Sequence, residues 1–135
     1  MALINWNDSY SVRIAEMDKQ HQHLFDLINK LHEAMGQGKG SETLPGVFES
    51  LVKYTQTLFA DEESLMLKYG YPGLALQKRQ HAELIAQVVE LQKKFQAGDF
   101  SSSIKTRDFL KQWLIEHIQE SDKKYGVFLG QKGIT

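Results

Sequence analysis

The sequence predicts an all-α protein, an up-down-up-down antiparallel four-helix bundle with an N-terminal arm. Apolar residues recur at helical steps of three and four in four segments of the chain. Glycine and proline separate these segments, and the links are short, so consecutive helices should be antiparallel neighbours. With 135 residues, of which 41% are hydrophobic, the chain is long enough for one cored domain and too short to expect two.

The expected single domain has two parts. Residues 1–17 form the arm, and the bundle covers residues 18–125. The arm carries apolar and aromatic side chains that should pack on the bundle: Trp6, Tyr10, Val12 and Ile14.

The first two helices are expected over residues 18–35 and 43–69, separated by "GQGKG". The inward-facing line of the first helix consists of His21, Leu24, Ile28, Leu31 and Met35. The line of the second consists of Phe48, Leu51, Thr55, Leu58, Glu62 and Leu65. The stretch "YGYPG" ends the second helix, because glycine and proline interrupt helices.

The third and fourth helices are expected over residues 74–97 and 103–124, separated by "AGD". The third has a regular heptad line of Leu74, Gln77, His81, Leu84, Val88, Leu91 and Phe95. The line of the fourth consists of Leu110, Trp113, Leu114, His117 and Ile118.

Composition excludes several classes of function. A formal net charge of −1 provides no basic surface for nucleic acid or an anionic membrane. No segment is apolar enough to span a bilayer, and the N-terminus lacks the pattern of a signal peptide. The absence of cysteine removes disulfides, thiolate metal sites and thiol catalysis. We therefore expect a monomeric cytoplasmic protein that binds neither nucleic acid nor membranes.

Each of the four apolar lines is interrupted by a side chain that can bind metal: His21, Glu62, His81 and His117. His21 and His81 lie near the starts of the first and third helices, and Glu62 and His117 lie near the ends of the second and fourth. Because neighbouring helices run in opposite directions, all four positions fall at the same end of the bundle. A fifth, Asp122, follows His117 by five residues, about 140° round an ideal helix. It is expected to turn inward only where the fourth helix frays.

These five residues favour a metal site over ordinary packing. Buried carboxylates and imidazoles are costly unless they are paired or bound to metal. A lone histidine is more often a hydrogen-bonded core residue, but five such side chains converge here from four helices. Imidazole with carboxylate suits iron, zinc or manganese. By contrast, His23, His32 and the stretch "ADEES" are expected at the solvated surface or its boundary.

Four stretches carry a resemblance to the bacterial hemerythrins: "SVRIAEMDKQHQHLFDLINKLHEAM", "LFADEESLMLKYGYP", "KRQHAEL" and "EHIQESDKKYGVFL". The resemblance extends from Trp6 to about Leu129. It implies a four-helix bundle whose two iron ions reversibly bind O2. By this resemblance His21, His81 and His117 match histidine ligands, and Glu62 and Asp122 match the two carboxylates that bridge the irons.

Two positions depart from the family pattern. In "LFADE", Leu58 stands where the family has a histidine ligand, and in "QKRQH", Gln77 replaces another. Carried over, one iron keeps only His21, and this is the iron whose open position binds O2 in the family. The other keeps two histidines, and Gln77 can offer at most an amide oxygen. Natural divergence and deliberate removal of ligands would both produce this pattern.

The resemblance favours an O2-binding protein with a ligand-depleted iron centre. One or two iron ions would bind, and O2 or a small anion would be the partner. Trp113 and Leu114, one turn before His117, should line an apolar pocket beside the metal. Two alternatives stay open. One is an oxidase or peroxidase-like site with opened coordination positions, and the other is a metal-free scaffold or sensor module.

Overall fold

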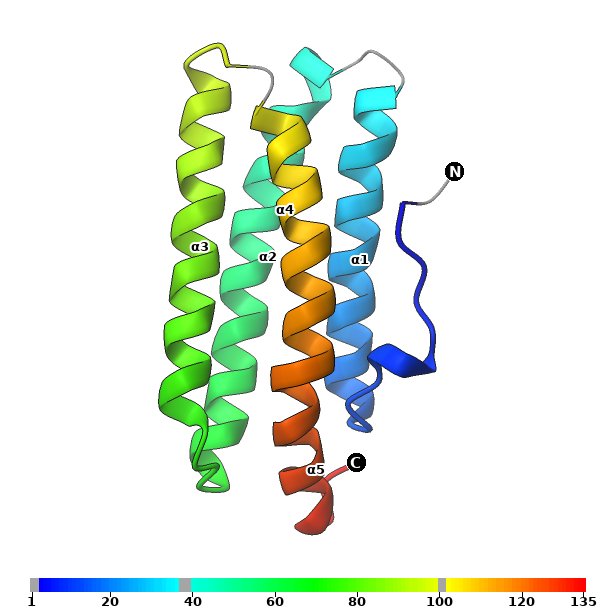
Figure 1. Cartoon of the computed structure of the whole chain (residues 1–135), viewed down its shortest axis with the longest axis vertical. Coiled ribbons are helices and arrows are strands. Elements are labelled where there is room, and N and C mark those ends of the chain that lie inside the picture. Colours follow the sequence, from blue (N-terminus) through cyan, green and yellow to red (C-terminus); the bar gives the residue numbers. More distant parts are fainter. Residues whose placement is uncertain (1–2, 37–39, 100–101) are drawn as a thin grey trace.

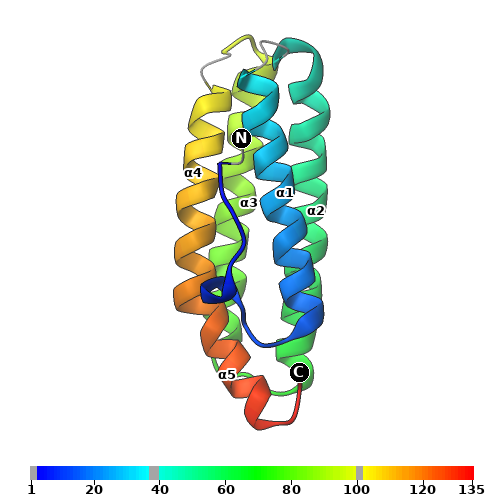
Figure 2. The same ribbon diagram turned by 90° about the vertical axis from the view of Figure 1, so that its right-hand side faces the viewer.

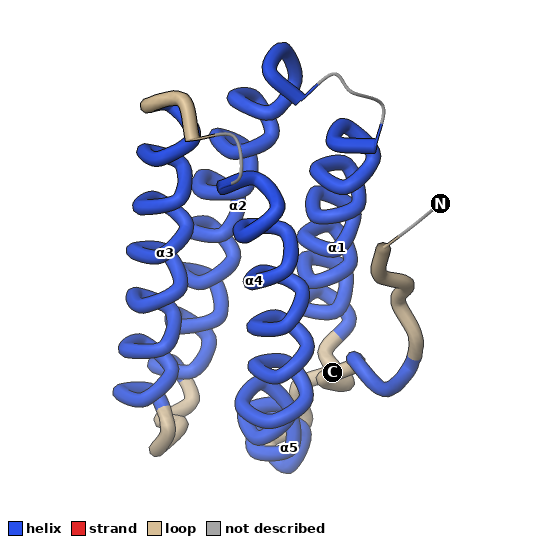
Figure 3. Tube along the Cα trace, turned by 45° about the horizontal axis from the view of Figure 1, so that its top comes forward, coloured by secondary structure: helices blue, strands red, loops and turns tan. Residues whose placement is uncertain are grey.

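The computed structural model describes residues 3–36, 40–99 and 102–135, and within these ranges it contains helices and no strand (Figure 3). The elements follow in the order η1 (Asp8–Tyr10), α1 (Ala15–Gly36), α2 (Gly40–Lys68), α3 (Leu74–Gln96), α4 (Ser102–Glu116), η2 (His117–Asp122) and α5 (Lys123–Gln131). η1 is a 3-10 turn and η2 is a π-helical turn. The all-α prediction is therefore confirmed.

The four long helices stand side by side with alternating direction, and the arm runs along the outside of α1 and α4 (Figures 1 and 2). Contacts join α1 to α2, α2 to α3, α3 to α4 and α4 back to α1, which closes the bundle. The predicted up-down-up-down arrangement is thus confirmed. No helix in the described ranges combines the length and apolar character that a membrane crossing requires.

Three boundaries differ from those expected. α1 begins at Ala15 and α2 at Gly40, each a few residues before the predicted start. The fourth helix does not end near residue 124 but continues through η2 and α5 to Gln131. Residues 37–39 of the predicted "GQGKG" break lie outside the described residues.

Two side chains of α1 hold the arm. Asn29 Oδ1 accepts hydrogen bonds from the backbone N–H groups of Leu3 and Ile4, at 2.9 and 3.0 Å. Asn29 Nδ2 donates to Ile4 O at 2.9 Å. Near the start of α1, the Asp18 carboxylate accepts from Val12 N and from Ser11 Oγ. These bonds satisfy buried backbone groups in a segment without regular structure.

The buried apolar residues form two clusters, one above the other along the bundle. The larger cluster includes Leu24, Leu58 and Ile118. The smaller one, at the α5 end, includes Val12, Ile14, Met17, Met66, Tyr125 and Leu129. The predicted line of α2 changes at this end, because Met66 is fully buried and Leu65 only half-buried. Round an ideal helix Met66 lies about 40° from Glu62, whereas Leu65 lies about 60° from it on the other side.

Candidate metal centre

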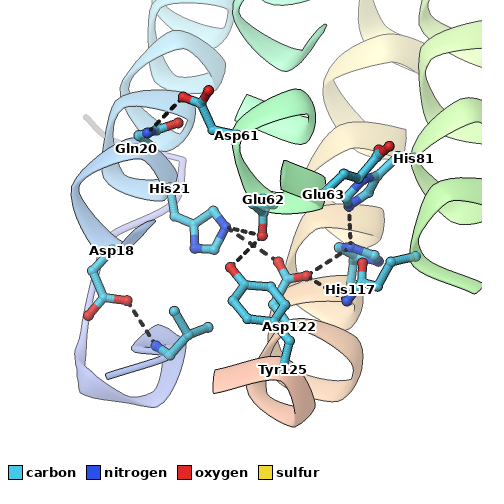
Figure 4. A network of polar contacts seen from close by, with 12 residues as sticks. Asp18, Gln20, His21, Asp61, Glu62, Glu63, His81, His117, Asp122 and Tyr125 are labelled. Atoms are coloured by element: carbon cyan, nitrogen blue, oxygen red, sulfur yellow. Dashed lines mark hydrogen bonds and ion pairs between the residues drawn. The ribbon is translucent and has the colours of Figure 1, made fainter. Parts of the chain in front are cut away.

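A layer of polar side chains separates the two apolar clusters. Along α1, His21 lies between Met17 of the smaller cluster and Leu24 of the larger one. On α2, Glu62 lies in the same way between Leu58 and Met66. The layer contains all five predicted residues, and each is at most 6% exposed: His21, Glu62, His81, His117 and Asp122. The five side chains therefore meet near one end of the bundle, as the sequence predicted (Figure 4).

Asp122 lies inward because of a π-helical turn and not because the helix frays. In η2 the backbone N–H of Lys123 donates to Ile118 O, five residues earlier. A bond to the fifth preceding residue widens the turn and brings residues five apart onto one side. As a result Asp122 Oδ1 lies 3.0 Å from His117 Nε2, although the two residues would diverge on a regular α-helix.

His21 faces both carboxylates without forming a hydrogen bond to either. Its Nε2 lies 3.3 Å from Asp122 Oδ2 and 3.5 Å from Glu62 Oε2. Both ring nitrogens of His21 and Glu62 Oε1 are buried and have no hydrogen-bond partner among the described residues. Buried polar atoms without partners are costly, and a cation beside His21 Nε2 could be coordinated by this nitrogen and by carboxylate oxygens of Glu62 and Asp122.

The part of the layer around His81 and His117 differs, because its polar atoms contact one another directly. His81 Nε2 lies 3.2 Å from His117 Nε2, and His117 Nε2 lies 3.0 Å from Asp122 Oδ1. His81 Nδ1 lies 2.8 Å from Glu63 Oε2. An ionised Glu63 requires the proton of neutral His81 to be on Nδ1, which leaves the Nε2 lone pair directed at the centre. Glu63 was expected at the solvated surface or its boundary, and its side chain is 24% exposed, but its contact with a buried imidazole was not predicted.

Tyr125 is a further member of the layer that the sequence pattern did not predict. It is fully buried, and its phenol donates a hydrogen bond to Glu62 Oε2. Tyr125 follows Asp122 by three residues, and this spacing on a helix could have signalled a shared face. The phenol occupies one carboxylate oxygen and leaves Glu62 Oε1 free.

Leu58 and Gln77, the two positions where the resemblance implies a lost histidine, also lie in the core. Leu58 is fully buried and belongs to the larger apolar cluster. Gln77 is 2% exposed, its Nε2 donates to Asp122 Oδ1 at 3.2 Å, and its Oε1 has no hydrogen-bond partner among the described residues. Gln77 therefore supports a carboxylate of the centre through its amide nitrogen.

Aromatic rings cover the histidines of α3 and η2. Phe59 stacks on His81 with ring centroids 3.7 Å apart, and Trp113 stacks on His117 at 4.2 Å. Leu114 is buried, whereas Trp113 is half-buried. Beside Trp113 a pocket of about 200 Å³ reaches His117, and its lining residues are Gln80, Glu83, Trp113, Glu116, His117, Glu120 and Ser121. Trp113 thus lines a pocket that reaches His117, but Leu114 is not among its lining residues and most of that lining is polar.

The charges in the layer stabilise one another. Burial alone would lower the pKa of His21, but the Glu62 and Asp122 carboxylates raise it above its ordinary value. Burial alone would raise the pKa of Asp122, but His117, His21 and His81 lower it. Burial and the same two carboxylates raise the pKa of Tyr125 well above its ordinary value, so the phenol stays protonated.

The donor set fits a metal centre. Two groups of side chains each place their ligand atoms within 4.8 Å of one another, His81 with His117 and Asp122, and His21 with Glu62 and Asp122. Asp122 belongs to both groups. Neutral imidazoles and carboxylates in a buried site are the ligands that iron, zinc and manganese accept.

Residues 12–129 match the family model described as "Hemerythrin HHE cation binding domain". The chain belongs to the hemerythrin family. It is 36% identical over 127 residues to a bacteriohemerythrin of Methylococcus capsulatus, covering 93% of this chain and 96% of that protein. A bacteriohemerythrin of Pseudomonas aeruginosa is 38% identical over 126 residues, covering 93% of this chain and 80% of that protein.

A myohemerythrin and a solved hemerythrin structure agree with this assignment. A myohemerythrin of Riftia pachyptila is 33% identical over 120 residues, covering 89% of this chain and 88% of that protein. The crystal structure of a wild-type hemerythrin matches with a TM-score of 0.86 and 34% identity, covering 93% of this chain and 96% of that chain. The hemerythrin resemblance in the sequence is therefore confirmed, and iron is the cofactor that the family supports.

Proposed function

We propose that this protein binds O2 at an iron centre held by His21, Glu62, His81, His117 and Asp122. The observation that carries the proposal is the buried His21–Glu62–Asp122 group, in which His21 Nε2 lies 3.3 and 3.5 Å from two carboxylate oxygens and has no hydrogen-bond partner among the described residues. Iron bound there would supply the reversible coordination of O2 for which the hemerythrin family is known. One or two iron ions would occupy the centre, and O2 or a small anion would be the ligand.

The protein's own residues would hold and shield the iron. Glu63 orients His81, Tyr125 orients Glu62, and Gln77 orients Asp122. Phe59 and Trp113, which stack on the rings of His81 and His117, would shield one face of each imidazole. Since Leu58 provides no donor atom and Gln77 is engaged through its nitrogen, we propose that iron is retained less firmly and O2 binding is weakened relative to a centre with histidine at both positions.

A second candidate function has a specific observation in its favour. His81, His117 and Asp122 form a group of two histidines and one carboxylate, the arrangement that non-haem iron oxygenases use with open coordination positions. Such a centre would oxidise an added reductant instead of binding O2 reversibly. We also propose that the protein is a monomer and that it acts in the cytoplasm.

One experiment separates the functions. The protein is loaded with Fe(II) without oxygen and then exposed to air, while metal content and the visible spectrum are recorded. An absorption band that appears with O2 and disappears when O2 is removed supports the proposal. Turnover of an added reductant favours the oxidase, and failure to retain any metal favours a metal-free scaffold or sensor module and overturns both.

A further inference from the structure

A pocket of about 520 Å³ lies outside the metal centre, where the start of α1, the end of α2 and the segment after α5 meet. Backbone hydrogen bonds hold that last segment in place. Ala15 N donates to Thr135 O at 2.9 Å, and Ile134 N donates to Leu129 O at 3.0 Å. The walls of the pocket are therefore built from three parts of the chain that the fold brings together.

The interior of this pocket is largely apolar. Ile14 and Met17 line it at the start of α1, Leu65 lines it on α2, and Ile134 lines it on the segment after α5. All four belong to the smaller apolar cluster or pack against it. A volume of this size is ordinary for a small-molecule site, and apolar walls favour a ligand that buries hydrocarbon. A hydrated metal ion would gain nothing from such walls.

The polar lining of the pocket is mainly acidic. Gln20 Nε2 donates to Glu16 Oε1 at 3.3 Å and to Asp61 Oδ2 at 3.2 Å, so one neutral amide draws two carboxylates together across α1 and α2 (Figure 4). Neither carboxylate forms a salt bridge with a described residue. Lys68 also lines the pocket, but its ammonium lies over the ring of Tyr69, 5.4 Å from the ring centroid.

These polar side chains keep acceptor atoms that the chain itself does not use. Glu16 Oε2 and Asp61 Oδ1 take no part in the bonds to Gln20. Gln20 Oε1 is buried and has no hydrogen-bond partner among the described residues. Two carboxylates held close together repel each other, and a cation beside both would turn this repulsion into attraction. A primary ammonium group has three N–H donors, which matches the three unused acceptors in number.

We propose that this pocket binds a primary amine with an apolar body. Its ammonium group lies at Glu16 and Asp61, and its hydrocarbon part lies against Ile14, Met17 and Leu65. The inference does not depend on the proposed function, because no residue that lines the pocket is a proposed metal ligand. It assigns the chain a second ligand, an organic cation, at a site separate from the iron centre.

Hexylamine is a suitable probe, because its amino group, like that of lysine, is protonated at pH 7. Hexan-1-ol and hexanoate have the same chain length but are neutral and negatively charged. Titration calorimetry on the full chain, with the metal it holds as purified, measures the affinity for each compound. We expect hexylamine to bind with one site per chain, hexan-1-ol to bind several-fold more weakly, and hexanoate to bind most weakly.

Charge variants test the role of the two carboxylates. Glu16→Gln combined with Asp61→Asn keeps the size of both side chains and removes both charges. This double variant should lose the preference for hexylamine over hexan-1-ol. The matched control is Glu49→Gln combined with Glu90→Gln, which removes two carboxylates outside the pocket and should keep the preference.

A second pair of variants locates the site. Ser64 is an exposed residue of the pocket lining, so Ser64→Trp should fill the pocket and abolish hexylamine binding. Gln56→Trp places the same side chain at an exposed position of α2 that does not line the pocket, and it should bind hexylamine normally. Circular dichroism shows that each variant is folded.

Four results would overturn the inference. These are no binding of hexylamine to the unaltered chain, equal affinities for hexylamine and hexan-1-ol, a preference for the amine that survives loss of both carboxylates, and binding that survives Ser64→Trp. None of them involves loading the protein with iron or exposing it to O2, so the amine site can fail while the proposed function stands. Likewise, a failure of iron binding would leave the amine site intact.

Discussion

Gln77 donates a hydrogen bond from its side-chain amide to Asp122 Oδ1 over 3.2 Å, across the interface between α3 and η2. Gln77 therefore acts on the centre through the Asp122 carboxylate. The atom that it turns toward this carboxylate is the amide nitrogen, which carries hydrogen atoms. An amide N–H cannot serve as a metal ligand, so only the opposite oxygen of Gln77 could coordinate. That oxygen is buried without a hydrogen-bond partner among the described residues.

Replacing both Leu58 and Gln77 with histidine should raise the retained iron towards two ions per chain, because each substitution adds a neutral nitrogen donor. Iron is measured after extensive dialysis against a chelator. The matched control carries methionine at both positions, which fills the space without a nitrogen donor. Two irons retained by the unaltered chain under the same dialysis would contradict the prediction.

Removing the Glu63 carboxylate should weaken metal binding without changing any proposed ligand. Glu63 Oε2 lies 2.8 Å from His81 Nδ1 and fixes the proton of that imidazole. Loss of such a partner typically lowers metal affinity about 10- to 100-fold. Competition with a coloured chelator measures the change for Glu63→Ala, with Glu90→Ala as an exposed control on α3. Equal affinities for both variants would show that Glu63 does not position His81.

The pair of Tyr125 and Glu62 should be strongly coupled in the metal-free protein. Tyr125→Phe leaves a carboxylate oxygen without its donor, and Glu62→Leu leaves a buried hydroxyl without its acceptor. Each change should lower the free energy of unfolding by about 1–3 kcal/mol. The double variant removes both polar groups and should be less destabilised than the sum of the single variants. Urea unfolding measures all four proteins, and simple additivity would contradict the coupling.

Gly126 should tolerate no larger side chain. A Cβ at this position would collide with the backbone oxygen of Val12, where the arm crosses α5. Gly126→Ala should therefore destabilise the fold, because backbone atoms would have to move. Gly130, also on α5, has nothing within 4 Å of an added Cβ, so Gly130→Ala should stabilise the helix by up to about 1 kcal/mol. Thermal unfolding compares the two, and similar midpoints would refute the prediction.

Stability of the metal-free protein should pass through a maximum between the ordinary pKa values of Asp122 and His21, 3.8 and 6.5. The pKa of His21 is raised, so its stabilising contribution is complete below pH 6.5 and is lost as the pH rises through the folded-state pKa. The pKa of Asp122 is lowered, so its contribution is present above pH 3.8 and is lost as the pH falls.

Urea unfolding between pH 3 and pH 8 tests this dependence. His21→Gln removes the imidazole and should flatten the decline on the alkaline side. Bound metal should oppose that decline, because imidazoles must be neutral to coordinate. A metal-free protein whose stability rises steadily from pH 6 to pH 8 would contradict the assignment.

The sequence by itself determined the bundle and the depth at which its polar residues meet. Helical spacing of apolar residues depends on local geometry alone, and short links force neighbouring helices to be antiparallel. Placing His21, Glu62, His81 and His117 at one end required only these two rules.

The tertiary structure decided how that layer is connected. Asp122 points inward because η2 is a π-helical turn. No residue pattern in η2 predicts such a turn, because packing and not local propensity stabilises it. The partners of Glu63 and Tyr125 lie 18 and 63 residues away in the sequence, so only the folded chain brings them together. The resemblance implied that Gln77 replaces a histidine, but it could not predict the hydrogen bond to Asp122, because the direction of a side-chain amide is set by its three-dimensional surroundings.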